Sequence, residues 1–155
     1  MEKIASFTVN HLKLKKGLYV SRKDQKDGVV LTTFDVRLTE PNVEEPISNP
    51  ALHTIEHLGA TFLRNGKLKS EVVYFGPMGC RTGFYLILFG DRTPEEIYST
   101  IIETCDFIID FNGEIPGYSP IECGNYTEHD LKEAKIAVER YRNYLRINKN
   151  FQYQD

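Results

Sequence analysis

The chain has 155 residues, of which 41% are hydrophobic and 26% charged, and this is the composition of an ordinary globular protein with enough length for one core. A formal net charge of −3 offers no positive surface to nucleic acid or to an anionic membrane, and no apolar run is long enough to cross a bilayer. Three cysteines without a secretory start favour reduced thiols in the cytoplasm over a disulfide framework.

Five stretches have strand character: residues 5–9, 17–20, 29–39, 71–75 and 83–90. In the third of these, Phe34 and Val36 share one face while Asp35 and Arg37 share the other. The last two are apolar at successive positions, which predicts strands covered on both faces. Loops are expected at residues 22–28, 40–48 and 112–127, and the length of the last loop indicates a functional segment.

Three helices are expected: residues 49–66, residues 93–108 and residues 128–147. In the first, Asn49 is the predicted N-cap and Pro50 the first helical residue. The second opens with a capping box of Thr93 and Glu96. The order of strands and helices predicts an α+β fold, with a mainly antiparallel sheet packed with helices in a single-domain sandwich over residues 1–155.

The stretch HTIEH, residues 53–57, places two histidines one helical turn apart. On a helix, His53 and His57 share one face, so both imidazoles can bind one metal ion. Glu56 flanks them and can carry a proton near the ion without being a ligand. This His-x-x-Glu-His order is the reversed zincin pattern. The alternative is a polar stripe on a surface helix, and the apolar neighbours of the motif favour the metal.

Catalytic metal centres usually take three protein ligands and leave one position open. Cys123, beside Gly124 in the long loop, is the best third ligand, although a free cysteine is more often a small buried residue. His129 is a weaker contender, because we expect it in the first turn of the last helix.

Cys80 lies in a turn rich in glycine and proline, with Arg81 next to it. A partly exposed thiol near a cation and a metal has a lowered pKa, which suits an acid/base or nucleophilic role. The alternative is a turn cysteine with no chemistry. Cys105 fits the apolar stripe of the second helix and is assigned to the core.

Five longer stretches carry a family resemblance: SFTVNH (6–11), TFDVRLTEPN (33–42), HTIEHLGATFLRN (53–65), GPMGCRTGFY (76–85) and ECGNYTEHDL (122–131). In sequence, order and spacing they resemble the S-ribosylhomocysteine lyases, the small metalloenzymes that make the precursor of the autoinducer-2 quorum-sensing signal. The resemblance covers nearly the whole chain and is far more specific than the histidine motif alone.

The resemblance implies that His53, His57 and Cys123 hold one divalent metal ion per subunit, with Fe²⁺ as the native ion and Zn²⁺ or Co²⁺ also accepted. It implies Glu56 and Cys80 as the acid/base pair. No redox cofactor is required, because the carbonyl shifts of the implied reaction are internal to the substrate.

The resemblance also implies that Ser6, His11 and Arg37 line the substrate pocket. For His11 and Arg37 the residues alone favour ordinary polar contacts, and only the resemblance reverses this. The family is homodimeric with its active sites at the subunit interface. Tyr74 and Gly76 depart from the family, in which an acidic residue and a serine are common at these positions.

The implied reaction cleaves the thioether of S-ribosylhomocysteine to homocysteine and 4,5-dihydroxy-2,3-pentanedione. The C–S bond breaks with difficulty, because the adjacent carbon carries no acidic proton. Migration of the carbonyl along the ribose makes that proton acidic, and the thiolate then leaves by β-elimination. A Lewis-acid metal with an open position would stabilise charge on the sugar oxygens. Signal synthesis and recycling in the methyl cycle are both compatible with this chemistry.

Three other interpretations compete with the lyase. A reversed-zincin peptidase shares the histidine motif, but such enzymes are usually much larger and use a downstream glutamate as third ligand. A structural or sensing metal domain would close the site with four ligands, often with more than one cysteine. A plain dimeric scaffold would leave Cys80 with ordinary thiol reactivity.

Overall fold

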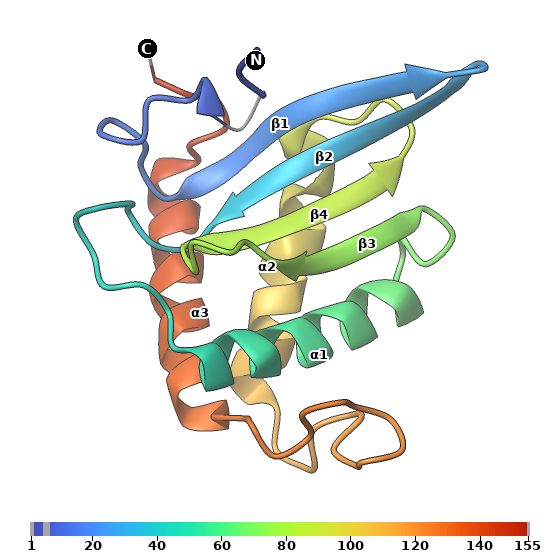
Figure 1. Cartoon of the computed structure of the whole chain (residues 1–155), viewed down its shortest axis with the longest axis vertical. Helices are drawn as coiled ribbons and strands as arrows, with labels where there is room; N and C mark the ends of the chain where they lie inside the picture. The colour runs from blue at the N-terminus through green and yellow to red at the C-terminus, as the bar shows by residue number, and fades with distance from the viewer. Residues whose placement is uncertain (1, 5–6, 155) are drawn as a thin grey trace.

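The computed structural model describes residues 2–4 and 7–154, and these residues form an α+β fold, as predicted (Figure 1). The strands are β1 (Gly17–Lys26), β2 (Val29–Arg37), β3 (Val72–Pro77) and β4 (Gly83–Phe89). The helices are α1 (Asn49–Asn65), α2 (Pro94–Asp110) and α3 (Leu131–Asn148). Within the described ranges, no helix is both long and apolar enough to span a bilayer.

All strand pairs are antiparallel, and the strand order across the sheet is β1-β2-β4-β3. Strand β1 continues to Lys26, so the loop predicted at residues 22–28 is reduced to the turn at Asp27 and Gly28. The prediction failed because exposed polar residues in this stretch are held in the strand by backbone pairing with β2. The strand predicted at residues 5–9 is also wrong for residues 7–9, which form turns, while residues 5–6 lie outside the described part.

The first two helices begin with side-chain caps. Ser48 caps α1 and accepts a hydrogen bond from the backbone of Ala51 at 3.4 Å, so the cap is one residue earlier than predicted and Asn49 is helical. The shift is possible because proline fits the first helical positions without needing an N–H donor. In α2 the predicted capping box of Thr93 and Glu96 is confirmed.

Helix α3 begins later than predicted. Asp130 is its N-cap and accepts a hydrogen bond from the backbone of Glu133 at 2.8 Å. An acceptor side chain at this position satisfies a helix-end N–H that would otherwise lack a partner. His129 therefore precedes the helix and does not lie in its first turn.

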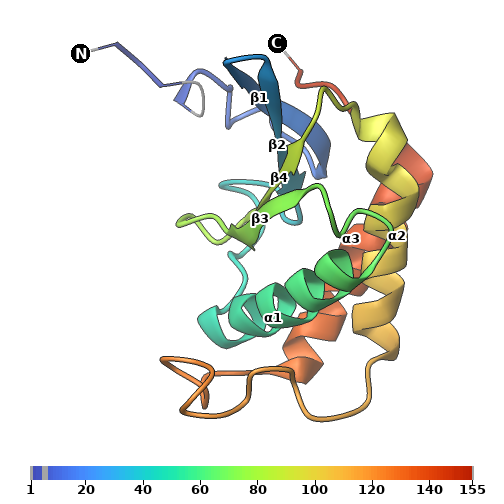
Figure 2. The same cartoon turned by 90° about the vertical axis from the view of Figure 1, so that its right-hand side faces the viewer.

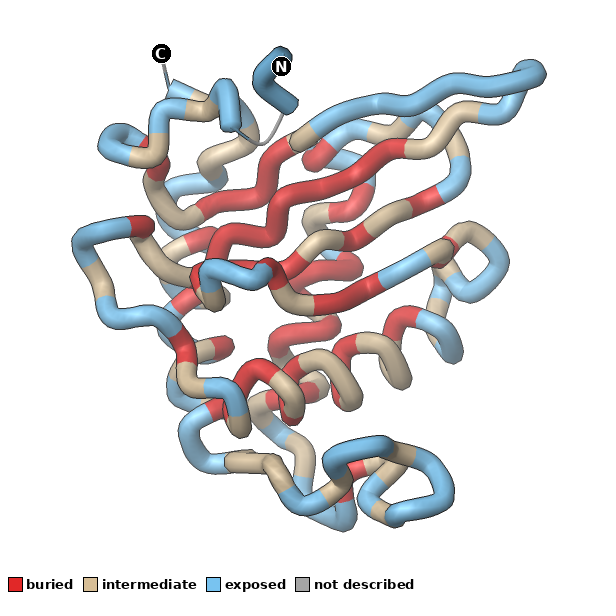
Figure 3. The backbone as a smooth tube through the Cα atoms, viewed as in Figure 1, coloured by how far each residue is buried: buried red, intermediate tan, exposed pale blue. Residues whose placement is uncertain are grey.

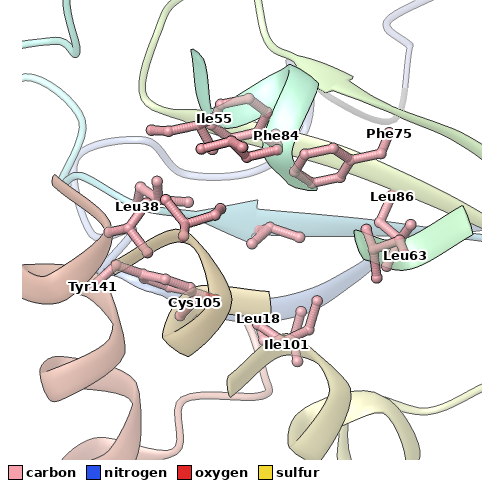
Figure 4. Packing of buried hydrophobic residues seen from close by; sticks show 14 of the residues in the cluster. Leu18, Leu38, Ile55, Leu63, Phe75, Phe84, Leu86, Ile101, Cys105 and Tyr141 are labelled. Atoms are coloured by element: carbon pink, nitrogen blue, oxygen red, sulfur yellow. The ribbon is translucent and has the colours of Figure 1, made fainter. Parts of the chain in front are cut away.

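Helices α2 and α3 cover one face of the sheet, and α1 runs beside β3 below it (Figure 2). The core between them is built from alternate residues of the strands and the apolar stripes of the helices (Figure 4). Phe34, Phe84 and Leu86 are fully buried there. Cys105 is also buried, as predicted, and burial raises the pKa of its thiol to about 12.

The opposite face of the sheet is partly uncovered within one chain. Tyr74 and Phe89 expose 46% and 47% of their surface there, and Tyr85 and Ile87 between them are only partly buried. Figure 3 shows buried residues concentrated in the middle of the sheet, while the far end of the β1–β2 hairpin is exposed. The expectation that β3 and β4 are covered on both faces is therefore wrong for the isolated chain, because helices pack on only one face.

Candidate active site

Two histidines from α1 and a cysteine from the loop between α2 and α3 come together. The loop passes along the side of α1 away from the sheet (Figure 1). One donor atom from each of His53, His57 and Cys123 lies within 4.8 Å of the others, and the Cys123 Sγ is 3.4 Å from the His53 Nε2. Across the described residues, His129 is outside this group.

Both histidines are held by a hydrogen bond between one ring nitrogen and a backbone carbonyl. The His53 Nδ1 is 2.9 Å from the Glu128 carbonyl, and the His57 Nδ1 is 2.6 Å from the Pro116 carbonyl. A carbonyl oxygen only accepts, so each Nδ1 carries the proton and each Nε2 keeps its lone pair. Two imidazoles and one thiolate within this distance fit a divalent transition-metal ion.

The loop approaches α1 closely because it contains Gly117. This residue has a φ of +79°, and a Cβ there would lie 3.1 Å from the His57 ring. A side chain would therefore both strain the backbone and crowd the imidazole. Glu56, one position before His57, is partly buried beside the same group.

Cys80 lies in the β3–β4 turn, beside a buried ion pair. Its Sγ is 3.1 Å from the Thr82 Oγ1 and 3.9 Å from the Arg37 Nη1. Arg37 also donates to Asp35 at 2.6 and 3.0 Å, and both side chains are almost fully buried. Burial alone would lower the pKa of Arg37, but the Asp35 carboxylate overrides this and raises it, which keeps the guanidinium charged.

The surroundings of Cys80 favour its thiolate form. Partial burial raises the pKa of the thiol, but hydrogen bonds from the Thr82 hydroxyl and backbone, together with the charge of Arg37, outweigh burial. The pKa of Cys80 is therefore below the ordinary value of 9.0. The sequence predicted a partly exposed thiol beside a cation, and the structure shows this with Arg37 as the cation. The sequence also predicted a metal close to Cys80, but the Cys80 cavity and the His53 group share no residue within one chain.

Replacing Thr82 with valine is expected to raise the pKa of the Cys80 thiol, because the hydroxyl that bonds the thiolate is lost. Below the thiol pKa, the rate of alkylation by iodoacetamide should then fall, since the thiolate is the nucleophile. Peptide mass spectrometry over a pH series separates Cys80 from Cys105, which burial makes the slowest thiol. An unchanged pH profile in the variant would contradict the assigned cause.

His11, Arg37 and Cys80 line one cavity of about 250 Å³, together with Asp35 and Tyr153. None of its lining residues is a member of the His53 group. A larger cavity of about 490 Å³ beside α3 contains none of the predicted site residues. Ser6, also predicted to line the pocket, lies outside the described residues.

Sequence reasoning missed Asp35 and Tyr153 of this cavity wall, and Thr82 beside Cys80. The Tyr153 hydroxyl donates to Asp35 at 2.9 Å, and the Tyr153 ring stacks on Tyr19 with centroids 4.6 Å apart. Asp35 and Thr82 had a detectable signal, because each is two residues from a predicted site residue. Tyr153 had no such signal, because the sequence around it does not indicate which part of the fold this segment packs against.

Tyr74 and Gly76, the two positions at which a departure from the resembled family is expected, lie in contact. A Cβ at position 76 would overlap the Tyr74 hydroxyl. A side chain at position 76 would therefore require the Tyr74 ring to move.

Comparison with known proteins gives one consistent match. The model of the family described as S-Ribosylhomocysteinase (LuxS) matches residues 4–151. The S-ribosylhomocysteine lyase of Clostridium acetobutylicum is 62% identical over 143 residues, which cover 91% of this chain and 90% of that protein. The S-ribosylhomocysteine lyase of Finegoldia magna is 58% identical over 146 residues, with 94% and 92% covered. That of Borreliella burgdorferi is 52% identical over 142 residues, with 91% and 90% covered.

Proposed function

Because the chain belongs to the S-ribosylhomocysteinase (LuxS) family, we propose that it is a metal-dependent lyase that converts S-ribosylhomocysteine to homocysteine and 4,5-dihydroxy-2,3-pentanedione, the autoinducer-2 precursor. Members of this family are carbon–sulfur lyases, and this chain is one of them. The observation that carries the proposal is the pairing, in one chain, of a three-donor metal group with a thiol of lowered pKa. The whole of residues 1–155 forms one lyase domain in this proposal.

His53, His57 and Cys123 would hold the metal ion through two Nε2 atoms and one Sγ. When bound, the ion supplies a Lewis acid that stabilises negative charge on the sugar oxygens. Fe²⁺ is the proposed ion, and the donor set also suits Zn²⁺ and Co²⁺. The carbonyls of Glu128 and Pro116 support the ligands by orienting both rings.

Glu56 and Cys80 would move the protons. Carbonyl migration requires that a proton leave one ribose carbon and arrive at the next, and the elimination requires removal of another. Cys80, as a thiolate, serves as one base, and Glu56, adjacent to the metal ligands, serves as the other. Each correctly placed acid or base typically contributes about 10²- to 10⁴-fold to the rate.

Arg37 and His11 would anchor the substrate in the cavity that contains Cys80, through its hydroxyls or its carboxylate. Arg37 suits this role because its charge is fixed and its direction is set by Asp35. Ser6 has the same proposed role from the family resemblance alone.

The active enzyme is proposed to be a homodimer with its sites at the subunit interface. The uncovered sheet face around Tyr74 and Phe89 supports this, because large exposed apolar side chains on one face favour association. The separation of the Cys80 cavity from the metal donors supports it as well, since a partner can bring the two halves together. The free thiols at Cys80, Cys105 and Cys123 suit a cytoplasmic location.

The direct test is an assay of thiol release from S-ribosylhomocysteine, using protein prepared anaerobically and accompanied by metal analysis. We expect free homocysteine in proportion to bound metal. The absence of thiol release from protein loaded with Fe²⁺ or Co²⁺ would rule out the proposed reaction.

Mixed dimers test the shared site. Chains carrying Glu56→Ala and chains carrying Cys80→Ala should each be inactive alone. Co-expression should restore about one quarter of the parent activity, because about half of random dimers are mixed and each mixed dimer retains one intact site. Purification through two different tags isolates the mixed species for the thiol assay.

Pairing Glu56→Ala with His57→Ala provides the control, because both changes affect the same half of the site and no intact site can form. Absence of restoration in the first pair would show that each chain builds its site alone, whereas restoration in this control would show that Glu56 and His57 do not act in the same half of the site.

A further inference from the structure

The segment 128–130, just before α3, contacts α1 at several points around the metal donors. The Glu128 carbonyl accepts from the His53 Nδ1 at 2.9 Å. The backbone N–H of Asp130 is 3.0 Å from the Thr54 Oγ1 and 3.2 Å from the Pro50 carbonyl. The side chain of His129, which stands between Glu128 and Asp130 in the sequence, also packs against α1. The proposed reaction gives His129 no role.

The hydrogen bonds of the Thr54 hydroxyl determine which nitrogen of the His129 ring carries the proton. The Thr54 hydroxyl donates its only proton to the Pro50 carbonyl at 2.9 Å. Its oxygen then accepts from the Asp130 N–H and from the His129 Nδ1 at 3.1 Å. Because the hydroxyl has no second proton, the His129 Nδ1 must be the donor. The His129 Nε2 is consequently an acceptor, and it is buried without a partner among the described residues.

The His129 ring packs against both metal-binding imidazoles. It stacks on His53 with centroids 4.2 Å apart and planes inclined by 17°, and it meets His57 edge-on at 4.9 Å. The rings of His53 and His57 are themselves nearly perpendicular, at 89°. His129 therefore fills the angle between two rings whose orientation decides where their Nε2 atoms point.

A histidine at this place combines two properties. Phenylalanine would supply a flat ring and avoid the buried lone pair, but it could not donate to Thr54. Asparagine could donate but would leave the angle between the ligand rings empty. An unpaired buried acceptor such as the His129 Nε2 disfavours folding. A histidine at this position is explained if the flat ring and the Nδ1 donor are both needed.

We propose that His129, held by Thr54, is a positioning residue of the metal centre: it fixes the orientation of His53 and His57 without binding the ion. This inference rests on the proposed function only in assigning a metal to the His53 group. It extends that function to a residue outside the ligand set.

The test measures Co²⁺ binding to the full-length chain, by competition with a chelator and by the absorption spectrum of the bound ion. His129→Ala and Thr54→Val are expected to weaken Co²⁺ affinity by about 10- to 100-fold, the range for removal of an outer-shell partner. The spectrum should change in shape or intensity, because the ligands are less well oriented. His129→Phe keeps the ring and should retain more affinity than His129→Ala.

Two threonine variants give matched controls. Thr54→Ser keeps the hydroxyl and should restore parent-like binding. Thr104→Val removes the same kind of bond, since Thr104 is buried in α2 and donates to the carbonyl four residues earlier at 2.7 Å. It should lower the thermal stability of the metal-free protein by less than Thr54→Val, because it removes one hydrogen bond and Thr54→Val removes three. It should leave Co²⁺ affinity and spectrum unchanged.

Parent-like affinity and spectrum in both His129→Ala and Thr54→Val would overturn the inference. So would loss of Co²⁺ binding in His129→Ala as complete as in His57→Ala, because His129 would then be a ligand. If the parent chain itself bound no Co²⁺, the proposed metal centre would fall, and the inference with it. Equal binding by parent and variants would remove the inference alone.

Discussion

Replacement of Cys80 by alanine is expected to reduce thiol release from S-ribosylhomocysteine by about 10²- to 10⁴-fold, the contribution of one acid/base group, while bound metal stays at the parent level. The sulfur of Cys80 belongs to the cavity with Arg37 and is absent from the metal donor group. Its removal should therefore eliminate proton transfer and leave the ligands intact. Thiol release and metal content, measured on the same preparation, check both parts.

Two further variants make this result specific. Cys105→Ala removes a thiol that is buried in the core and should keep near-parent activity, with a modest loss of stability. Glu56→Ala should behave as Cys80→Ala does and retain the metal, since Glu56 is assigned to proton transfer. Near-normal turnover in the Cys80 variant would remove that residue from the mechanism.

Replacement of Cys123 by alanine is expected to abolish activity by a different route. It removes one of three donors, so the metal affinity should fall by more than about 100-fold, the upper figure for loss of an outer-shell partner. The variant should be purified with little metal, and its Co²⁺ form should lack the absorption that sulfur ligation produces. Elemental analysis and Co²⁺ titration provide the measurements.

The fold also predicts how stable the Cys123→Ala variant is without metal. Cys123 lies in an irregular loop and is only partly buried, so the melting temperature of the metal-free protein should change little. Metal content equal to the parent would show that the sulfur is not a ligand. A protein that loses metal but keeps turnover would instead contradict the metal-dependent reaction.

Local signals in the sequence predicted the elements that depend on neighbouring residues. The capping box of Thr93 and Glu96 in α2 was confirmed because both partners lie within one helical turn. The N-cap of α1 is Ser48 and not the predicted Asn49. Serine and asparagine can both cap a helix, and only the backbone angles decide which of the two adjacent residues does so. The full length of β1 escaped prediction because its outer residues are exposed and polar, and only pairing with β2 holds them in the strand.

By itself, the sequence determined the helical motif that places His53, Glu56 and His57 along one stretch of α1, because helical spacing is a local property. The tertiary structure decided what surrounds that motif. Cys123 approaches His53 from 70 positions away, and the carbonyls that orient His53 and His57 come from 75 and 59 positions away. Contacts over such separations depend on how the loop before α3 packs on α1, which no local pattern encodes. The same holds for His129, whose position beside the ligands follows from the late start of α3.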